Sequence, residues 1–394
     1  MNGFVYSVPT TVYFGSDEFR HLGEEVAGLG RTVLLCYGGG SIKRTGLYDR
    51  VMGQLAEQGL QVVELSGIEP NPRIGSVREG VRLCKEHDVD VVLAVGGGST
   101  IDCAKFVCAG ARSDRDPWDW FADKTIPITD ALPLVTVLTL AATGSEMDDT
   151  GVISNPELQE KQGRGARVLL PKASFLDPEN SYSVPPSQTA AGSADIIAHT
   201  LEVYLTTEDD LFFLDTFMEG LLRTVVRFAP VAMRDPTNYE ARANLMWASS
   251  WAINGFADGG KRHGWSAHPM EHELSAFYDI THGLGLAILL PRWMRHCLDK
   301  DPATAGKLAQ LAEQVFGVTD PALTEREKAE AGIDALAAFF TDELGLASTL
   351  GEIGIGDEHF ERMAKKACDG KGGTIHGFVD LEPADVVAIF EACQ

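Results

Sequence analysis

Short apolar segments alternate with amphipathic segments in the first part of this 394-residue chain, and this alternation restricts the fold more than any other feature. Between the apolar runs, the apolar residues of LYDRVMGQLAEQG and IGSVREGVRLCKEHD recur at helical spacing. Strands that alternate with helices predict a parallel α/β sheet. The runs predicted as strands, each bounded by glycine, proline or charge, are Thr32–Tyr37, Gln61–Leu65, Asp90–Val95 and Leu134–Leu140.

The pattern changes at Pro185-Pro186, a pair that cannot lie inside a helix and marks a predicted domain boundary. Few strand-forming runs follow. We therefore expect an α/β domain over residues 1–184 and an all-helical domain over residues 185–394. The helices predicted for the second domain are Gln188–Tyr204, Leu211–Phe228, Tyr239–Asn254, His268–Phe277, Gly283–Cys297, Ala303–Phe316, Glu325–Leu344 and Asp357–Ala367.

Two of the predicted strands end in the same four residues, GGGS. They are Gly38-Gly39-Gly40-Ser41 and Gly96-Gly97-Gly98-Ser99. Glycine lets the backbone approach a ligand closely, and a helix that starts after such a turn presents free N–H groups to a phosphate. A single turn of this kind is explained as well by a tight connection without a ligand, but two at strand ends favour a nucleotide site. Neither turn has the GxGxxG or GxxxxGK[ST] pattern.

The first of these turns indicates which nicotinamide cofactor is used. Sites that prefer NAD usually hold the adenosine ribose with an acidic residue near a strand end. Here Gly38–Ser41 offers no carboxylate, and Lys43 and Arg44 follow directly. A hydroxyl and two cations suit the 2′-phosphate of NADP, although both cations also fit ordinary solvated surface positions.

The stretch GSADIIAHTLEVYL places Asp195 four residues before His199 in an apolar helical segment, so both side chains lie on one helix face. Four of the ten histidines lie close together further along the chain: His263, His268, His272 and His282. Carboxylate and imidazole ligands suit zinc or iron(II). Histidines satisfied within a core would give the same pattern, and the spacing does not separate His268 from His272.

The sequence also resembles the iron-containing alcohol dehydrogenase family, and within it the branch of NADPH-dependent butanol dehydrogenases and aldehyde reductases. The resemblance covers nearly the whole chain. It implies a dinucleotide-binding α/β domain followed by an all-α metal-binding domain, a dehydroquinate synthase-like fold. The motifs that carry it include PTTVYFG, YGGGSIKRTG, GIEPNP, AVGGGSTIDCAK, LTLAATGSEM, LDPENSYSVPP, DIIAHTLEVYL, WSAHPMEHELSA and THGLGLAILLP.

The resemblance assigns roles to individual residues. It implies that Asp195, His199, His268 and His282 bind the metal, and that His272 lines the site, where it is a candidate catalytic proton donor. Gly39 stands where relatives that prefer NAD carry aspartate. Asp148 and Asp149 depart from the family pattern and are expected near the substrate entrance. The residues that the resemblance and the turns assign to the cofactor are Gly38, Gly39, Gly40, Ser41, Asn71, Gly97, Gly98, Ser99, Asp102, Thr139, Thr143 and Lys161.

The implied activity is that of a metal-dependent, NADP(H)-linked alcohol dehydrogenase or aldehyde reductase. It would interconvert short to medium aliphatic aldehydes and primary alcohols by hydride transfer, with Fe²⁺ or Zn²⁺, or else Mn²⁺ or Ni²⁺, as Lewis acid. One alternative is a metal-dependent cyclase or lyase similar to dehydroquinate synthase, which needs a cluster of cations; the sequence offers only scattered ones. The other is a nucleotide-binding protein without catalysis.

Composition excludes several other classes of protein. The net charge of −24, from 33 basic and 57 acidic residues, argues against binding nucleic acid or anionic membranes. No signal peptide or membrane-spanning run is evident, and the seven cysteines form no CxxC pair. We expect a cytoplasmic protein with reduced thiols, a small-molecule substrate and, by analogy with relatives, a homodimer.

Overall fold

The computed structural model describes residues 2–208 and 211–394. These residues form two compact units. The α/β unit contains residues 7–184 and 236–250, and the helical unit contains residues 2–6, 185–208, 211–235 and 251–394. Helix α9 (Tyr239–Ile253) therefore begins in the α/β unit, where the Trp247 ring packs edge-on against Phe14 with ring centroids 5.6 Å apart. The division into domains 1–184 and 185–394 stays a prediction.

Six parallel strands form the main sheet of the α/β unit, in the order β1-β8-β5-β4-β2-β3. The four strands predicted from the sequence are present and adjacent, which confirms the predicted fold class. The other two strands of this sheet, β1 and β8, were not predicted and have only four residues each. The six strands are β1 Thr11–Phe14, β2 Thr32–Tyr37, β3 Gln61–Leu65, β4 Val91–Gly96, β5 Leu134–Leu138 and β8 Ala173–Leu176.

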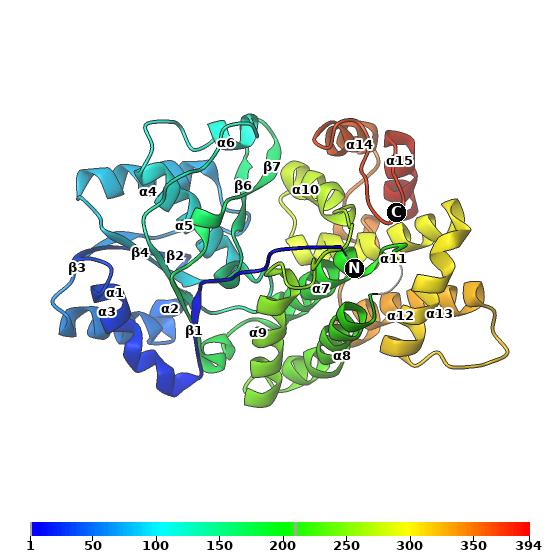
Figure 1. The fold of residues 1–394 in the computed structure, drawn as a ribbon, viewed down its shortest axis with the longest axis horizontal. Coiled ribbons are helices and arrows are strands. Elements are labelled where there is room, and N and C mark those ends of the chain that lie inside the picture. The colour runs from blue at the N-terminus through cyan, green and yellow to red at the C-terminus, as the bar shows by residue number, and fades with distance from the viewer. Residues whose placement is uncertain (1, 209–210) are drawn as a thin grey trace. The chain divides into compact units, whose positions relative to one another are not determined.

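Both faces of this sheet are buried, because successive side chains of a strand point to opposite faces. Val33 and Leu35 of β2 belong to one apolar cluster with helices α1 (Leu22–Ala27) and α3 (Leu47–Glu57). Leu34 and Cys36 belong to a second cluster with helices α4 (Ile74–Glu86) and α5 (Gly98–Ala111). The two helix layers lie on opposite sides of β2 and β4 (Figure 1).

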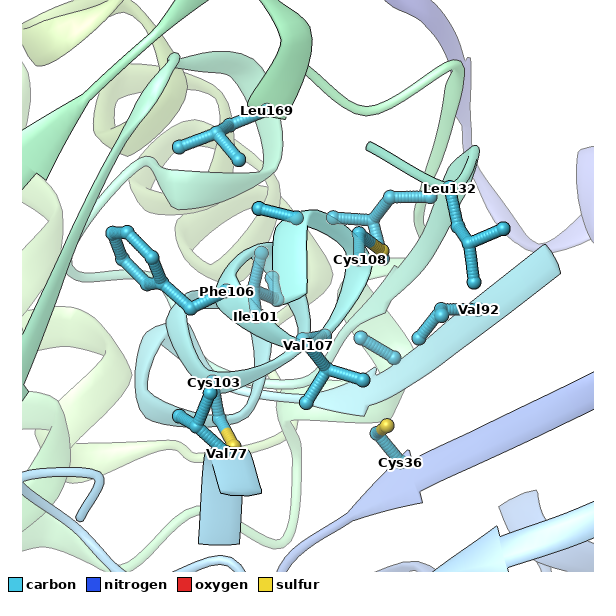
Figure 2. Packing of buried hydrophobic residues seen from close by; sticks show 14 of the residues in the cluster. Cys36, Val77, Val92, Ile101, Cys103, Phe106, Val107, Cys108, Leu132 and Leu169 are labelled. Carbon is cyan, nitrogen blue, oxygen red and sulfur yellow. The ribbon is translucent and has the colours of Figure 1, made fainter. Parts of the chain in front are cut away.

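Helix α5 has almost no exposed surface, since twelve of its 14 residues are buried. Figure 2 shows that Phe106, Val107 and Cys108 leave this helix in different directions and all end in apolar surroundings. Helix α4 approaches closely at Gly80, where a Cβ atom would lie 2.5 Å from Cγ2 of Val107. A helix that is apolar on all sides belongs inside a core rather than at a surface.

The buried helix α5 nevertheless carries a lysine. Lys105 has no exposed surface, and its Nζ donates to Oδ1 of Asp148 at 2.5 Å and to the carbonyl oxygen of Thr150 at 2.6 Å. Burial raises the pKa of Asp148 to about 7, and the ammonium of Lys105 acts against that shift. Asp148 is therefore the buried partner of Lys105. Thr150 begins the antiparallel hairpin of β6 (Thr150–Asn155) and β7 (Glu160–Gly165), which this pair ties to α5.

In the helical unit, α7 packs against α8 and α11, α10 against α11 and α14, and α12 against α13. Each of the eight predicted helices is present. The predicted end of α8 at Phe228 is wrong, because this helix continues through Pro230 to Arg234. None of the helices among the described residues is both long and apolar enough to cross a membrane. The helices of this unit are α7 Pro186–Tyr204, α8 Phe212–Arg234, α10 Ala267–Tyr278, α11 His282–Lys300, α12 Ala305–Phe316, α13 Glu325–Ala338, α14 Phe360–Asp369 and α15 Pro383–Ala392.

The Lys105–Asp148 pair gives a test of the core. Lys105→Met should lower the Tm of the α/β unit by roughly 6–20 °C, because leaving one buried charge without its partner costs about 3–5 kcal/mol. Scanning calorimetry measures this shift. Lys85→Met, at an exposed position of α4, is the matched control and should change Tm by about 2 °C or less. The double variant Lys105→Met/Asp148→Leu should recover most of the loss, and a single variant as stable as the wild type would contradict the assignment.

Candidate functional site

Helix α7 carries three polar side chains on one face although nearly all of it is buried. Asp195, His199 and Glu202 follow one another at i, i+4 and i+7, so they share a helix face. Their exposed fractions are only 3%, 4% and 1%. Buried polar groups need partners, and helices α10 and α11 bring His268 and His282 close to this face.

The four predicted metal ligands meet at Asp195. Its Oδ1 lies 3.6 Å from Nε2 of His199, 3.8 Å from Nε2 of His268 and 3.6 Å from Nε2 of His282. These distances are too long for hydrogen bonds. Donors that bind one ion at about 2.1 Å lie roughly 3.4 Å apart in a tetrahedral site. Among the described residues, Oδ1 of Asp195 and Nε2 of His268 have no hydrogen-bond partner. Donor atoms of Asp195, His268 and His282 all lie within 4.8 Å of one another and fit a divalent cation in type and spacing, and His199 lies 3.6 Å from the same Asp195 oxygen.

Two glutamates that the sequence analysis missed stand behind the histidines. Glu202 of α7 contacts Nδ1 of His268, and Glu271 of α10 contacts Nδ1 of His282. Both glutamates are fully or almost fully buried. A carboxylate on Nδ1 leaves Nε2 directed at the metal position, which is the usual arrangement for metal-bound histidines. A sequence pattern could have identified both glutamates, because each lies three residues after a predicted ligand.

The electrostatics of this cluster favour a positive charge. Burial lowers the pKa of His268, but Glu202 and Asp195 outweigh it and raise this pKa to about 9. Burial would raise the pKa of Asp195, but the neighbouring histidines hold it far below its usual range. Burial lowers the pKa of His199 to about 4, so this ring is neutral at pH 7. The same carboxylates that favour a proton here would favour a metal cation in its place.

Two further side chains lie beside the cluster. The ring of His272 is 6.3 Å from that of His268 and 5.6 Å from that of His282, measured between centroids. His272 is thus next to the predicted ligands, while His268 is the histidine of α10 that reaches Asp195. The Trp265 ring lies edge-on to His268 at 4.9 Å and to His199 at 5.8 Å, and it adds an apolar surface to the site.

In the α/β unit, the first glycine turn connects β2 to the short helix α2 (Ser41–Arg44). Gly40 has a φ of 90°, a conformation that favours glycine. A Cβ atom on the exposed Gly39 would meet nothing within 4 Å. The turn thus leaves open space at the carboxyl end of β2, where open α/β sheets bind ligands.

Lys43 of α2 lies in a cage of side chains beside this turn. Its Nζ is 5.0 Å from the ring centroid of Tyr37, 4.5 Å from that of Tyr48, and 3.7 Å from Oε2 of Glu64. The hydroxyls of Tyr37 and Tyr48 donate to the two oxygens of Glu64, at 2.5 Å and 2.7 Å. Both carboxylate oxygens are therefore occupied, and the charge of Glu64 is balanced by Lys43.

The second glycine turn, between β4 and α5, is packed tightly against the segment after β5. A Cβ atom on Gly98 would lie 2.1 Å from Oγ1 of Thr143, and one on Gly97 would lie 3.2 Å from Cβ of Leu140. The N–H of Thr139 donates to the carbonyl oxygen of Gly96 at 3.0 Å. The structure thus brings the predicted cofactor residues at 97–99, 139 and 143 together at the carboxyl ends of β4 and β5. The N-terminus of the 14-residue helix α5 lies at this place.

The remaining predicted cofactor residues form protein contacts in the same unit. Nζ of Lys161 donates to Oδ1 of Asn71 at 3.0 Å, so these two predicted cofactor residues are in direct contact. Asp102 accepts from Oγ of Ser145 at 2.6 Å and from the N–H of Val152 at 2.9 Å. Its carboxylate thereby joins α5 to the segment after β5 and to strand β6.

Comparisons with known proteins agree with this arrangement. By sequence, the chain is 48% identical over 391 residues to NADH-dependent butanol dehydrogenase A of Clostridium acetobutylicum, with 99% of each chain covered. It is 38% identical over 368 residues to the NADPH-dependent aldehyde reductase YqhD of Escherichia coli, with 93% of each covered. The crystal structure of NADH-dependent butanol dehydrogenase A from Thermotoga maritima is similar with a TM-score of 0.94 and 38% identity, over 100% of this chain and 99% of that one.

Family models cover almost the entire sequence. Residues 9–178 match the model of iron-containing alcohol dehydrogenase. Residues 189–394 match the C-terminal model of the Fe-containing alcohol dehydrogenase family. The chain therefore belongs to the iron-containing alcohol dehydrogenase family of oxidoreductases.

Proposed function

We propose that this protein is a metal-dependent, NADP(H)-linked alcohol dehydrogenase and aldehyde reductase for short to medium aliphatic substrates. The observation that carries the proposal is the position of Asp195, whose Oδ1 lies 3.6–3.8 Å from the Nε2 atoms of three histidines. The names of the butanol dehydrogenase and aldehyde reductase relatives support the substrate class. The family itself implies a nucleotide cofactor and a divalent metal.

The chemistry is divided between the chain and its ligands. When bound, the divalent ion supplies a Lewis acid for the carbonyl oxygen, and the nicotinamide supplies or accepts the hydride. Asp195, His199, His268 and His282 would hold the ion. His272, beside two of these rings, is the candidate for moving a proton, because imidazole exchanges protons near neutral pH.

The cyclase alternative receives no support from the helical unit. Such an enzyme would need several cations directed at a phosphorylated substrate. Four scattered cations of this unit contact other groups. Arg223 donates to the Gln314 carbonyl oxygen, and Arg227 lies over the Phe228 ring. Lys261 contacts Met218, and Arg262 pairs with Glu208. The complete set of four metal donors likewise disfavours a protein that only binds nucleotides.

Several finer expectations remain part of this proposal. Iron is the metal in the name of the family, and zinc suits the same ligands. All seven cysteines are buried free thiols, which supports the expected reducing, cytoplasmic compartment. The homodimer stays a prediction.

The preference for NADP(H) rests on the first glycine turn. Gly39 carries no carboxylate that would repel a 2′-phosphate, and the nearest acidic side chain of the cage, Glu64, is neutralised by Lys43 and two tyrosine hydroxyls. The relatives named above include both NADH-dependent and NADPH-dependent enzymes, so their names do not decide between the cofactors.

The metal site is tested by removing one donor. His268→Ala should weaken metal binding by more than the roughly 10–100-fold that is typical when an outer partner is lost. Elemental analysis after dialysis and NADPH oxidation with an aldehyde measure the two effects. His296→Ala is the control, because this histidine of α11 pairs with Asp385 at 3.0 Å. A His268→Ala protein that keeps one ion per chain would refute the assignment.

The cofactor preference is tested at Gly39. Gly39→Asp should lower kcat/KM for NADPH by roughly 10–100-fold, because the new carboxylate would repel the 2′-phosphate, and it should change kcat/KM for NADH far less. Gly53→Asp adds the same charge on α3, where a Cβ atom also meets nothing within 4 Å, and it should alter neither value. Equal use of both cofactors by the wild type would end this part of the proposal.

The substrate class is tested with linear aldehydes and their alcohols, assayed in both directions at neutral pH. Reduction should dominate, since it consumes a proton. Because an apolar site gains about 0.8 kcal/mol per buried CH₂, kcat/KM should rise by about fourfold per carbon until the site is filled. The matched probe is an aldehyde of equal length that ends in a carboxylate. A preference of several orders of magnitude for the charged compound, or no aldehyde reduction, would revive the cyclase alternative.

A further inference from the structure

One short sequence pattern occurs twice in the metal cluster. Residues 199–202 (HTLE) and 268–271 (HPME) each place a glutamate three positions after a histidine. Residues at this spacing are neighbours on a helix surface. In both places the histidine directs Nε2 toward Asp195, at 3.6 Å and 3.8 Å.

The glutamate of each pattern does not serve its own histidine. Glu202 of α7 contacts Nδ1 of His268 on α10, and Glu271 of α10 contacts Nδ1 of His282 at the start of α11. A glutamate of α7 therefore orients a ligand on α10, and a glutamate of α10 orients a ligand on α11. A proton held on Nδ1 by a carboxylate leaves the lone pair on Nε2, which is the form that binds a metal.

We infer that Glu202 and Glu271 are positioning residues that hold His268 and His282 in the tautomer and orientation required for metal binding. This inference rests on the proposed metal site. It assigns to a pair of carboxylates on the Nδ1 side of these histidines a large share of the affinity of the site.

The two glutamates differ in what else they hold. Glu202 also accepts from the N–H groups of Ser266, Ala267 at 2.5 Å and His268 at 3.2 Å, so it caps the N-terminus of α10. Glu202 thus fixes both the start of α10 and the first ligand on it.

Glu271 has different neighbours. Its Oε1 accepts from Oγ of Ser275 at 2.5 Å. A Cβ atom on Gly285 would lie 2.9 Å from its Cγ, so the glycine of α11 leaves the space that Glu271 fills. Glu271 therefore fills a close-fitting space between α10 and α11, and glutamine has the same shape.

The test is the dissociation constant for Zn²⁺ of the metal-free, full-length protein, titrated against a chelator. Glu271→Gln should weaken Zn²⁺ binding by about 10–100-fold, because the amide keeps the shape but loses the charge that makes His282 a good donor. Glu202→Gln should weaken Zn²⁺ binding by a similar factor and also lower the Tm of the metal-free protein, because α10 loses its charged cap.

The matched control is Glu273→Gln, a buried acid on the same helix that pairs with Lys366 at 3.4 Å. Its Zn²⁺ affinity should stay within about twofold of the wild type. The inference is overturned if Glu202→Gln and Glu271→Gln bind Zn²⁺ as tightly as the wild type, or if Glu273→Gln weakens binding equally. If His268→Ala also keeps its metal, the proposed metal site fails; if only the glutamate variants are unaffected, the positioning role alone fails.

Discussion

A buried carboxylate must be matched by positive charge or hydrogen bonds, and the arrangement of the helical unit follows from meeting this need at Asp195. Helix α7 carries the carboxylate into the interior, and the matching groups come from His199 on the same helix and from other helices. His268 begins α10 after a cap made by Glu202, and His282 begins α11. Gly283 lets α11 approach α7, since a Cβ atom there would lie 1.9 Å from the carbonyl oxygen of Ala191. The positions of the ligands therefore depend on how these helices pack, and the packing in turn depends on the ligands.

The α/β unit holds its two glycine turns at one edge of the sheet. Parallel strands bring their carboxyl ends to one edge, so turns far apart in the sequence become neighbours there. The second glycine turn is fixed by Thr143 and by the fully packed helix behind it, whereas the first turn borders open space.

Much of this could be predicted from the sequence, and the gaps have physical reasons. The central strands and α7 to α14 were predicted, because their periodicity extends over enough residues, whereas α15 was missed. Strands β1 and β8 were missed because four residues are too few for a period to show. Helix α8 was predicted to end at Phe228, two residues before Pro230, but packing of α8 keeps the helix intact around this proline.

The site was predictable only in part, for a similar reason. The shared face of Asp195 and His199 follows from helical spacing alone. The choice between His268 and His272 does not, because they are one turn apart on α10 and only the rotation of that helix toward α7 separates them. Here the family resemblance made the choice. Glu202, Glu271 and the Lys105–Asp148 pair were missed because their partners lie on other elements, which spacing along one helix cannot reveal.

The contrast between helices α2 and α5 has a consequence for how such a protein can change. Helix α2 is four residues long and mostly exposed, and the turn before it has room for a larger side chain. Helix α5 has no solvent-facing side on which a substitution would be harmless, and the turn before it touches side chains directly. Gly39 of the first turn can therefore be replaced at little structural cost, while the second turn can change only together with the layer around it. A lineage built on this unit is free to exchange the first turn, which we propose to read the adenosine end of the cofactor, without rebuilding the second turn, which we propose to hold its phosphates.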